Sequence, residues 1–152
     1  MNTLSIEAAN AKAFVRTRDH PPPHVHVVNR ADRWEARLGF SFLTSRVWLI
    51  DVTPLANSPA TVTLNAVVAT VTECLDQFRA DWWKVYGTTD LINRWIRVED
   101  LAPGPLVVEL SRWRKGANQV TAASYEPTTR ALSLVTRDGP RFELPAGSGR
   151  ME

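Results

Sequence analysis

The sequence predicts an α+β protein: an antiparallel sheet of about four strands packed against one long helix, followed by a small β-rich C-terminal appendage. Three observations predict this class. Four strand-like segments follow one another within about 45 residues, with links too short for parallel crossovers. An apolar stripe with helical spacing comes next, and short strands separated by turn residues follow it. We expect residues 1–98 to form the α+β domain and residues 99–152 the β-rich region.

The composition is that of a globular protein. Hydrophobic residues make up 44% of the 152 residues and charged residues 22%, close to the usual values. No apolar run reaches the length of about 18 residues that a membrane span needs, and the N-terminus lacks the pattern of a signal peptide. Cys74 is the single cysteine, which favours a reducing, cytoplasmic setting. The net charge of +2 is smaller than that of a dedicated nucleic-acid binder.

Four segments predict the strands of the antiparallel sheet. Residue types alternate in residues 11–18, 24–29 and 33–40, as expected where one face of a strand is buried. Residues 46–52 form a nearly continuous apolar run, which suits a more buried strand. Between the first two strands lie Pro21, Pro22 and Pro23. Proline has no backbone donor, so this triplet predicts a stiff extended connection.

A single amphipathic helix is predicted after the sheet. Its apolar residues recur at alternating steps of four and three, which makes one stripe. They are Leu64, Val68, Val71, Leu75, Phe78, Trp82 and Val85. Gly87 would end the helix, but its start is open: Ser58-Pro59 could cap it, or Asn65 could cap a helix that begins at Ala66. We expect the stripe to pack on the sheet, and a coiled-coil dimer is the alternative.

The rest of the chain predicts a short helical segment and a second group of strands. Residues 90–97 read as one or two helical turns capped by Asp90, and residues 102–105, APGP, are the strongest domain boundary. Short strands are expected at residues 106–110, 119–125, 131–136 and 141–144. The final AGSGRME is expected to fray.

All three histidines lie in one segment, DHPPPHVHV, which runs from Asp19 to Val27. His24 and His26 are two positions apart on a predicted strand, so both imidazoles leave the same face. His20 lies across the prolines, and Asp19 adds a carboxylate. Two or three histidines with a carboxylate suit zinc or another first-row transition metal. Asp19, His20, His24 and His26 are therefore the candidate metal ligands, and zinc is the cofactor that the motif suggests.

Two other interpretations of the motif remain open. In the first, His20, His24 and His26 are acid–base catalysts that cleave a phosphodiester beside Arg16 and Arg18, without a metal. In the second, the histidines hydrogen-bond backbone carbonyls that the prolines leave without ladder partners. The motif would then be a rigid corner of the sheet. This structural role is compatible with either functional one.

Two aromatic features are candidate binding sites for a partner. Trp83 follows Trp82 in the predicted helix and points about 100° away from the stripe, so it either packs against the C-terminal region or binds a partner. Arg112, Trp113 and Arg114 interleave an indole with cations, a combination that can hold phosphate and stack on bases. A solvated hairpin edge is the simpler explanation of these three residues.

Residues 11–86 resemble a family of small bacterial proteins of unknown function. Its members share a D-H-x-P-P-H-x-H pattern, followed by a strand and by a helix that ends near a tryptophan pair. The matching residues are Asp19, His20, Pro22, Pro23, His24 and His26. Residues 119–145 resemble faintly a companion domain that is often encoded beside this family, and some such pairs are regarded as toxin–antitoxin modules. The resemblance implies no assigned activity.

Together these features lead us to expect a binding or regulatory module of a toxin–antitoxin-like system. Its partner would be another protein or a second copy of the chain. The alternative is a small metal- or histidine-dependent phosphodiesterase that resembles a ribonuclease. A nucleic-acid partner has only weak support from the charge, and no membrane partner is expected.

Overall fold

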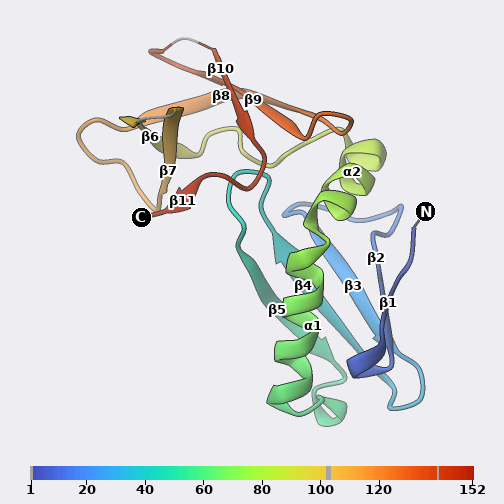
Figure 1. Cartoon of the computed structure of the whole chain (residues 1–152). Coiled ribbons are helices and arrows are strands. Elements are labelled where there is room, and N and C mark those ends of the chain that lie inside the picture. The colour runs from blue at the N-terminus through green and yellow to red at the C-terminus, as the bar shows by residue number, and fades with distance from the viewer. Residues whose placement is uncertain (1, 102–103, 140) are drawn as a thin grey trace. The chain divides into compact units, whose positions relative to one another are not determined.

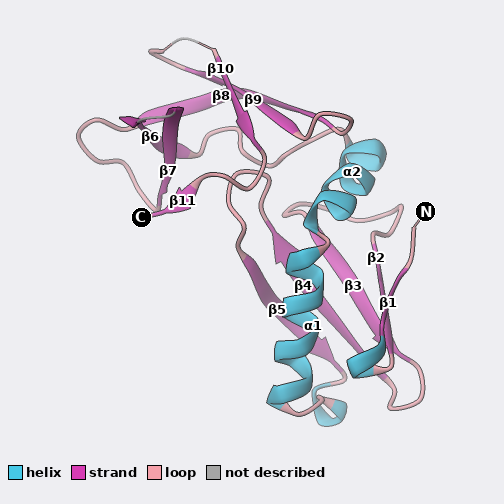
Figure 2. Ribbon diagram, viewed as in Figure 1, coloured by secondary structure: helices cyan, strands magenta, loops and turns pink. Residues whose placement is uncertain are grey.

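The computed structural model describes residues 2–101, 104–139 and 141–152. By its contacts the chain divides into two compact units: Met1–Phe40 with Arg46–Val85, and Ser41–Ser45 with Tyr86–Glu152. In the described part of the chain, each unit has its own sheet, of five strands in the first and six in the second, and two α-helices are present; Figures 1 and 2 show their arrangement within each unit. The mixed helix-and-strand class is confirmed, whereas "four strands and one long helix" was too simple. The division between the units comes at Val85, before the expected one at residue 98.

Five antiparallel strands form the sheet of the first unit, in the order β1-β2-β3-β4-β5. Their bounds are β1 Leu4–Ile6, β2 Ala11–Phe14, β3 His24–Asn29, β4 Trp34–Phe40 and β5 Val47–Thr53. The four predicted strands are present, and β1 is an additional edge strand. The first predicted strand was too long. It ends at Phe14, which pairs with His26.

Alternation gives this sheet one aliphatic face. Ala13, Val27 and Ala36 are directly opposite one another on β2, β3 and β4, and all three are fully buried. The neighbouring pair Val25 and Leu38 is fully buried as well. Because successive side chains on a strand point to opposite faces, the histidines of β3 lie on the other face of the sheet.

The single helix that the stripe predicted is two helices, α1 (Thr61–Glu73) and α2 (Leu75–Tyr86). Cys74 leaves the helical conformation, with φ −110° and ψ 18°, and its N–H bonds to the carbonyl of Val71. Two hydroxyls upstream, those of Thr70 and Thr72, donate to the carbonyls four residues before them, at 2.9 and 2.7 Å. Such back-bonding bends helices and accounts for the break without proline or glycine.

The apolar stripe is the buried side of these helices, with one change of position. Val71, Leu75, Phe78 and Trp82 are buried as expected, while Val67 takes the inner position that was assigned to Val68. In Figure 1, α1 lies along the sheet of the first unit, and its contacts are with β5 and with the short helix η1 (Glu7–Ala9).

The start of α1 differs from both expected caps. The helix begins at Thr61, and Ala60 precedes it without a side-chain cap. The Ser58 hydroxyl donates instead to the carbonyl of Leu55, which belongs to η2 (Leu55–Asn57). Asn65 lies within the helix and does not begin it.

Six strands form the sheet of the second unit, in the order β10-β9-β8-β6-β7-β11. Their bounds are β6 Trp95–Leu101, β7 Gly104–Leu110, β8 Asn118–Glu126, β9 Ala131–Thr136, β10 Phe142–Pro145 and β11 Arg150–Met151. The predicted helical turns over residues 90–97 are wrong. Asp90 and Asn93 have φ values of 58° and 72°, which a right-handed helix does not allow, and the chain then enters β6.

The two ends of the second unit also differ from expectation. β6 and β7 pair with each other up to Leu101 and Gly104. Gly104 and Pro105 of the expected boundary therefore belong to β7, and residues 102 and 103 lie outside the described residues. The C-terminus does not fray, because β11 pairs in parallel with β7. The Glu152 carboxylate also lies 2.7 Å from Nε of Arg114. No helix in the described part of the chain is long and apolar enough to cross a membrane.

Asp81 is a buried carboxylate on α2 that opposes folding. Its side chain is largely buried, and Asn2 donates a long hydrogen bond of 3.4 Å to Oδ1. Oδ2 has no hydrogen-bond partner among the described residues. Burial raises the pKa of Asp81, and Lys84 and Asn2 offset this only in part. The charged form is therefore less stable in the folded protein than in the unfolded chain.

Asp81→Asn is expected to raise the free energy of unfolding by about 1 kcal/mol at pH 7, because it removes the buried charge and keeps an acceptor for Asn2. A raised carboxyl pKa costs stability above the folded pKa, and the cost disappears as the pH falls toward the ordinary value of about 4. The gain should therefore shrink in urea unfolding at pH 4. Glu73→Gln, an exposed change on α1, is the control, and an Asp81→Asn protein less stable than this control at pH 7 would contradict the argument.

Candidate metal centre

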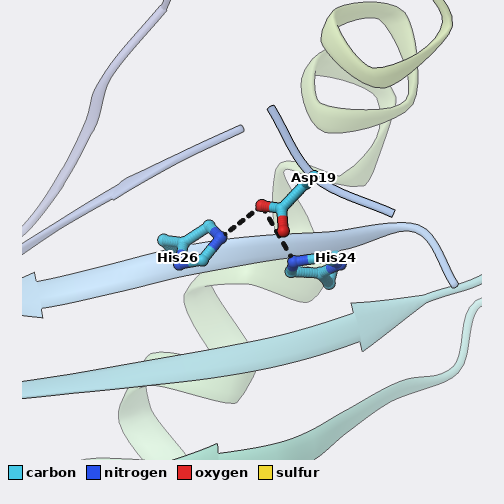
Figure 3. Close-up of side chains that lie close together, drawn as sticks. All are labelled: Asp19, His24 and His26. Carbon is cyan, nitrogen blue, oxygen red and sulfur yellow. Dashed lines mark hydrogen bonds and ion pairs between the residues drawn. The ribbon is translucent and has the colours of Figure 1, made fainter. Parts of the chain in front are cut away.

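Asp19, His24 and His26 form a buried cluster in the first unit (Figure 3). Oδ2 of Asp19 lies 2.6 Å from Nε2 of His26 and 3.1 Å from Nε2 of His24. Each side chain offers one ligand atom, and these atoms all lie within 4.8 Å of one another. The two imidazoles are 1% and 5% exposed, and the Asp19 side chain is 13% exposed. The cluster is thus largely shielded from solvent, and Asp19 is its most exposed member.

The local sequence builds this arrangement. β3 directs both imidazoles to one face, since His24 and His26 are two positions apart. The segment before β3 brings Asp19 back over that face, as Figure 3 shows. The prolines keep the corner in place through their carbonyls: that of Pro23 accepts from the N–H of Phe40 at 3.0 Å, and that of Pro22 lies 2.8 Å from Nδ1 of His24.

The contact with Pro22 determines the tautomer of His24. A carbonyl can only accept, so Nδ1 of His24 carries the proton, and a neutral His24 has a lone pair at Nε2. This lone pair faces the Asp19 carboxylate, and Nε2 is buried without a hydrogen-bond partner among the described residues. Two facing lone pairs repel each other. The contact becomes favourable when a cation lies between the atoms, either a proton or a metal ion.

His26 shows the complementary pattern. Its Nε2 is in hydrogen-bond contact with Asp19, while its Nδ1 is buried, has no hydrogen-bond partner among the described residues, and lies 3.7 Å from Oε2 of Glu35. If Nε2 bound a metal ion, the proton would move to Nδ1 and face the Glu35 carboxylate. A carboxylate behind a metal-bound histidine is a common arrangement in metal sites.

The charge state of Asp19 suits a ligand. Burial alone would raise the pKa of Asp19, but the hydrogen bond from His26 and the electrostatic attraction of His24 and His26 outweigh this effect and hold the pKa below its ordinary value. Asp19 is therefore ionised at neutral pH, as metal binding requires.

Two charged neighbours on β4 and β5 were not recognised in the sequence. Arg37 lies opposite His26 in the sheet and pairs with Asp51 through Nε–Oδ1 and Nη2–Oδ2 contacts of 2.9 and 2.5 Å. This hydrogen bonding holds the pKa of Asp51 below its ordinary value. The polar face of the sheet thus continues from the cluster across both strands.

Glu35 and Trp82 are further residues of the site that the motif did not include. Glu35 stands behind His26, as described, and the ring of Trp82 is centred 5.5 Å from that of His24. The alternation of residues 33–40 places Glu35 on the polar face of its strand, but the register with β3 is needed to bring it next to His26. Trp82 was assigned to the helix stripe, and only packing brings it to His24.

The other residues of the motif lie outside the cluster. His20 is exposed, its Nδ1 lies 2.9 Å from the carbonyl of Pro21, and its ring centre is 6.3 Å from that of His24. Arg16 forms an ion pair with Glu35 and is thereby connected to the site. Arg18 is exposed and has no ion pair among the described residues. The expected backbone contacts of His20 and His24 are present, and that of His24 coexists with the cluster.

The candidate partner residues are spread over both units. Trp83 lies on α2 and is half-buried. Arg112, Trp113 and Arg114 are exposed in the segment between β7 and β8, where the Trp113 residue is 62% exposed. Arg114 pairs with Glu152. The binding roles of these four residues stay predictions.

No protein-family model matches the chain. No curated protein and no solved structure matches it either. The resemblance of residues 11–86 and 119–145 to bacterial families therefore stays a prediction.

Proposed function

We propose that this protein is a metal-binding module in which Asp19, His24 and His26 hold a divalent first-row transition ion such as zinc. The observation that carries the proposal is the Nε2 atom of His24, a buried lone pair that faces a carboxylate without a hydrogen-bond partner in the described part of the chain. Two imidazole nitrogens and one carboxylate oxygen are a common zinc ligand set. The Glu35 carboxylate behind His26 adds support from outside the ligands.

The spacing of the ligand atoms is compatible with this role after a small adjustment. Zinc–nitrogen and zinc–oxygen distances are about 2.0–2.2 Å, so neighbouring ligand atoms of a tetrahedral site are about 3.3 Å apart. The two Asp19 contacts of 2.6 and 3.1 Å would have to widen by less than about 1 Å. The two imidazole nitrogens, which lie within 4.8 Å of each other, would have to come to the same spacing of about 3.3 Å. Asp19 lies in a connection outside the strands, where such a shift disturbs no ladder.

The sequence also predicts a wider role for the protein that contains this metal site. It is that of a binding or regulatory module in a toxin–antitoxin-like system, acting with a protein partner or a second copy of the chain. This part of the proposal rests on the resemblance of residues 11–86 alone. In such a module the ion would rigidify the segment that Asp19 and the prolines form immediately before β3.

A zinc titration tests the metal proposal. The untagged protein, stripped with a chelator, should bind one equivalent of zinc and gain about 2.7 kcal/mol of stability at a free zinc concentration one hundred times the Kd. His24→Ala/His26→Ala should lose both effects. His20→Ala is the matched control, because it removes a histidine of the same motif that lies outside the cluster. Zinc binding below about a tenth of an equivalent, or equal losses in both variants, would refute the proposal.

A metal-dependent phosphodiesterase is the second candidate. Three protein ligands leave a coordination position open, as in catalytic zinc sites, where the ion activates a water molecule. Asp19 is at the solvent side of the cluster, and Arg16 adjoins it through Glu35. If this is correct, the zinc-loaded protein should cleave single-stranded RNA and Asp19→Asn should not. Equal cleavage by the two proteins would exclude this activity for the cluster.

A further inference from the structure

A pocket of about 620 Å³ opens on the same face of the first sheet as His26. Its floor is formed by Phe14 of β2 and Val28 of β3, and Phe14 is directly opposite His26 in the sheet. The turn after β3 contributes Arg30 to its wall. The volume lies within the range of small-molecule sites in proteins.

The charge of this pocket is positive. Three cations line it, Lys12, Arg16 and Arg30, against the single acid Glu35. Glu35 already forms an ion pair with Arg16. Lys12 and Arg30 are exposed and have no ion pair with any residue that the structure describes. Two uncompensated cations therefore remain around an apolar floor, which is the composition of a site for an anionic organic molecule.

We propose that this pocket binds a phosphate group carried on a small organic molecule. Arg30 can bind phosphate through its planar fork and Lys12 as a point charge, while Phe14 and Val28 contact the apolar part of the ligand. The pocket is distinct from the metal ligands but adjoins them, because Oε1 of Glu35 pairs with Arg16 and Oε2 lies 3.7 Å from Nδ1 of His26. Binding of the phosphate does not require the metal ion, so this inference goes beyond the proposed function.

The test uses adenosine 5′-monophosphate as the probe, in calorimetric titrations of the protein with and without one equivalent of zinc. The monophosphate should bind and adenosine should not. Lys12→Gln/Arg30→Gln should weaken binding by about tenfold or more, since two charged contacts are lost. Arg137→Gln/Arg141→Gln removes the same charge from exposed positions of the second unit and should change the Kd less than about twofold. Titrations with inorganic phosphate and with a short oligoribonucleotide distinguish a free phosphate and a nucleic-acid strand as sources of the group.

Two outcomes would overturn the inference. One is the absence of binding of every phosphate-bearing probe up to about 5 mM, a concentration at which even weak specific sites fill. The other is binding that Lys12→Gln/Arg30→Gln leaves unchanged. The zinc affinity of this variant should equal that of the wild type, which reports that the sheet is intact. If neither the wild type nor Lys12→Gln/Arg30→Gln binds zinc, the metal site is refuted, and the proposed phosphate site is not affected.

Discussion

Replacing Asp19 by asparagine is expected to weaken zinc binding by at least about a hundredfold. Residues that only orient metal ligands contribute about 10- to 100-fold, and Asp19 supplies the one negative charge of the ligand set. Asparagine keeps the shape and one oxygen, but leaves only neutral ligands around a divalent cation. The affinity can be measured by competition with a chromogenic chelator. Glu35→Gln should reduce the zinc affinity less, because Glu35 contacts the ligand His26 and is not itself a ligand. An Asp19→Asn protein with wild-type zinc affinity would contradict the ligand assignment.

The same substitution has a pH signature in the metal-free protein. Since the pKa of Asp19 is lowered in the folded state, its carboxylate stabilises the fold above the ordinary value of about 4, and this stabilisation is lost as the pH falls below that value through the folded pKa. The wild type should therefore exceed Asp19→Asn in free energy of unfolding at pH 7, and the difference should narrow steadily as the pH falls below about 4. This is the opposite trend to that of Asp81, and one urea series covers both.

Trp82→Ala is expected to have the largest effect on stability, a loss of about 3–5 kcal/mol in the free energy of unfolding. The indole is fully buried and packs edge-on against Phe40, with ring centres 6.3 Å apart. Its removal leaves a cavity between α2 and the sheet, beside the ring of His24. Denaturant unfolding of the metal-free protein measures the loss without any contribution from zinc.

Trp113→Ala is the matched control for this experiment. It removes the same side chain from an exposed loop, and such changes usually stay within about 0.5 kcal/mol. A Trp82→Ala loss below about 1 kcal/mol would show that α2 is not anchored through this indole. A loss of several kcal/mol in Trp113→Ala would reveal packing of that residue that the described contacts do not include.

Periodicity predicted most of the regular structure, and it failed where the deciding interaction was not periodic. The strand patterns of β3 and β4 follow directly from alternation. β5 was predicted from an apolar run as a more buried strand, and this was wrong: its Leu49 and Ile50 are 43% and 36% exposed. The break at Cys74 depends on hydroxyl back-bonding by Thr70 and Thr72, which leaves the apolar spacing unchanged. Residues 90–97 were predicted as one or two helical turns because Asp90 is a common capping residue, whereas the left-handed φ of Asp90 begins a turn that leads into β6.

The site was predictable in part for similar reasons. The shared face of His24 and His26 was predictable, because it depends only on their spacing of two residues along one strand. The position of His20 outside the cluster was not predictable, because it depends on the path of the chain around Pro21, which carries the His20 ring away from His24 and His26. Glu35 required the register of β3 with β4, since a shift of one residue would place it on the other face.

The sequence by itself determined the α+β class, the strands around the prolines, the buried stripe and the rigid motif with two same-face imidazoles. These follow from rules that act over a few residues: side-chain alternation, helical spacing and the missing donor of proline. The tertiary structure alone decided that Asp19 meets both imidazoles, that Glu35 stands behind one of them, and that Lys12 and Arg30 share a pocket. Such contacts depend on strand register and loop path, which are set by packing of the whole unit and leave no periodic trace in the chain.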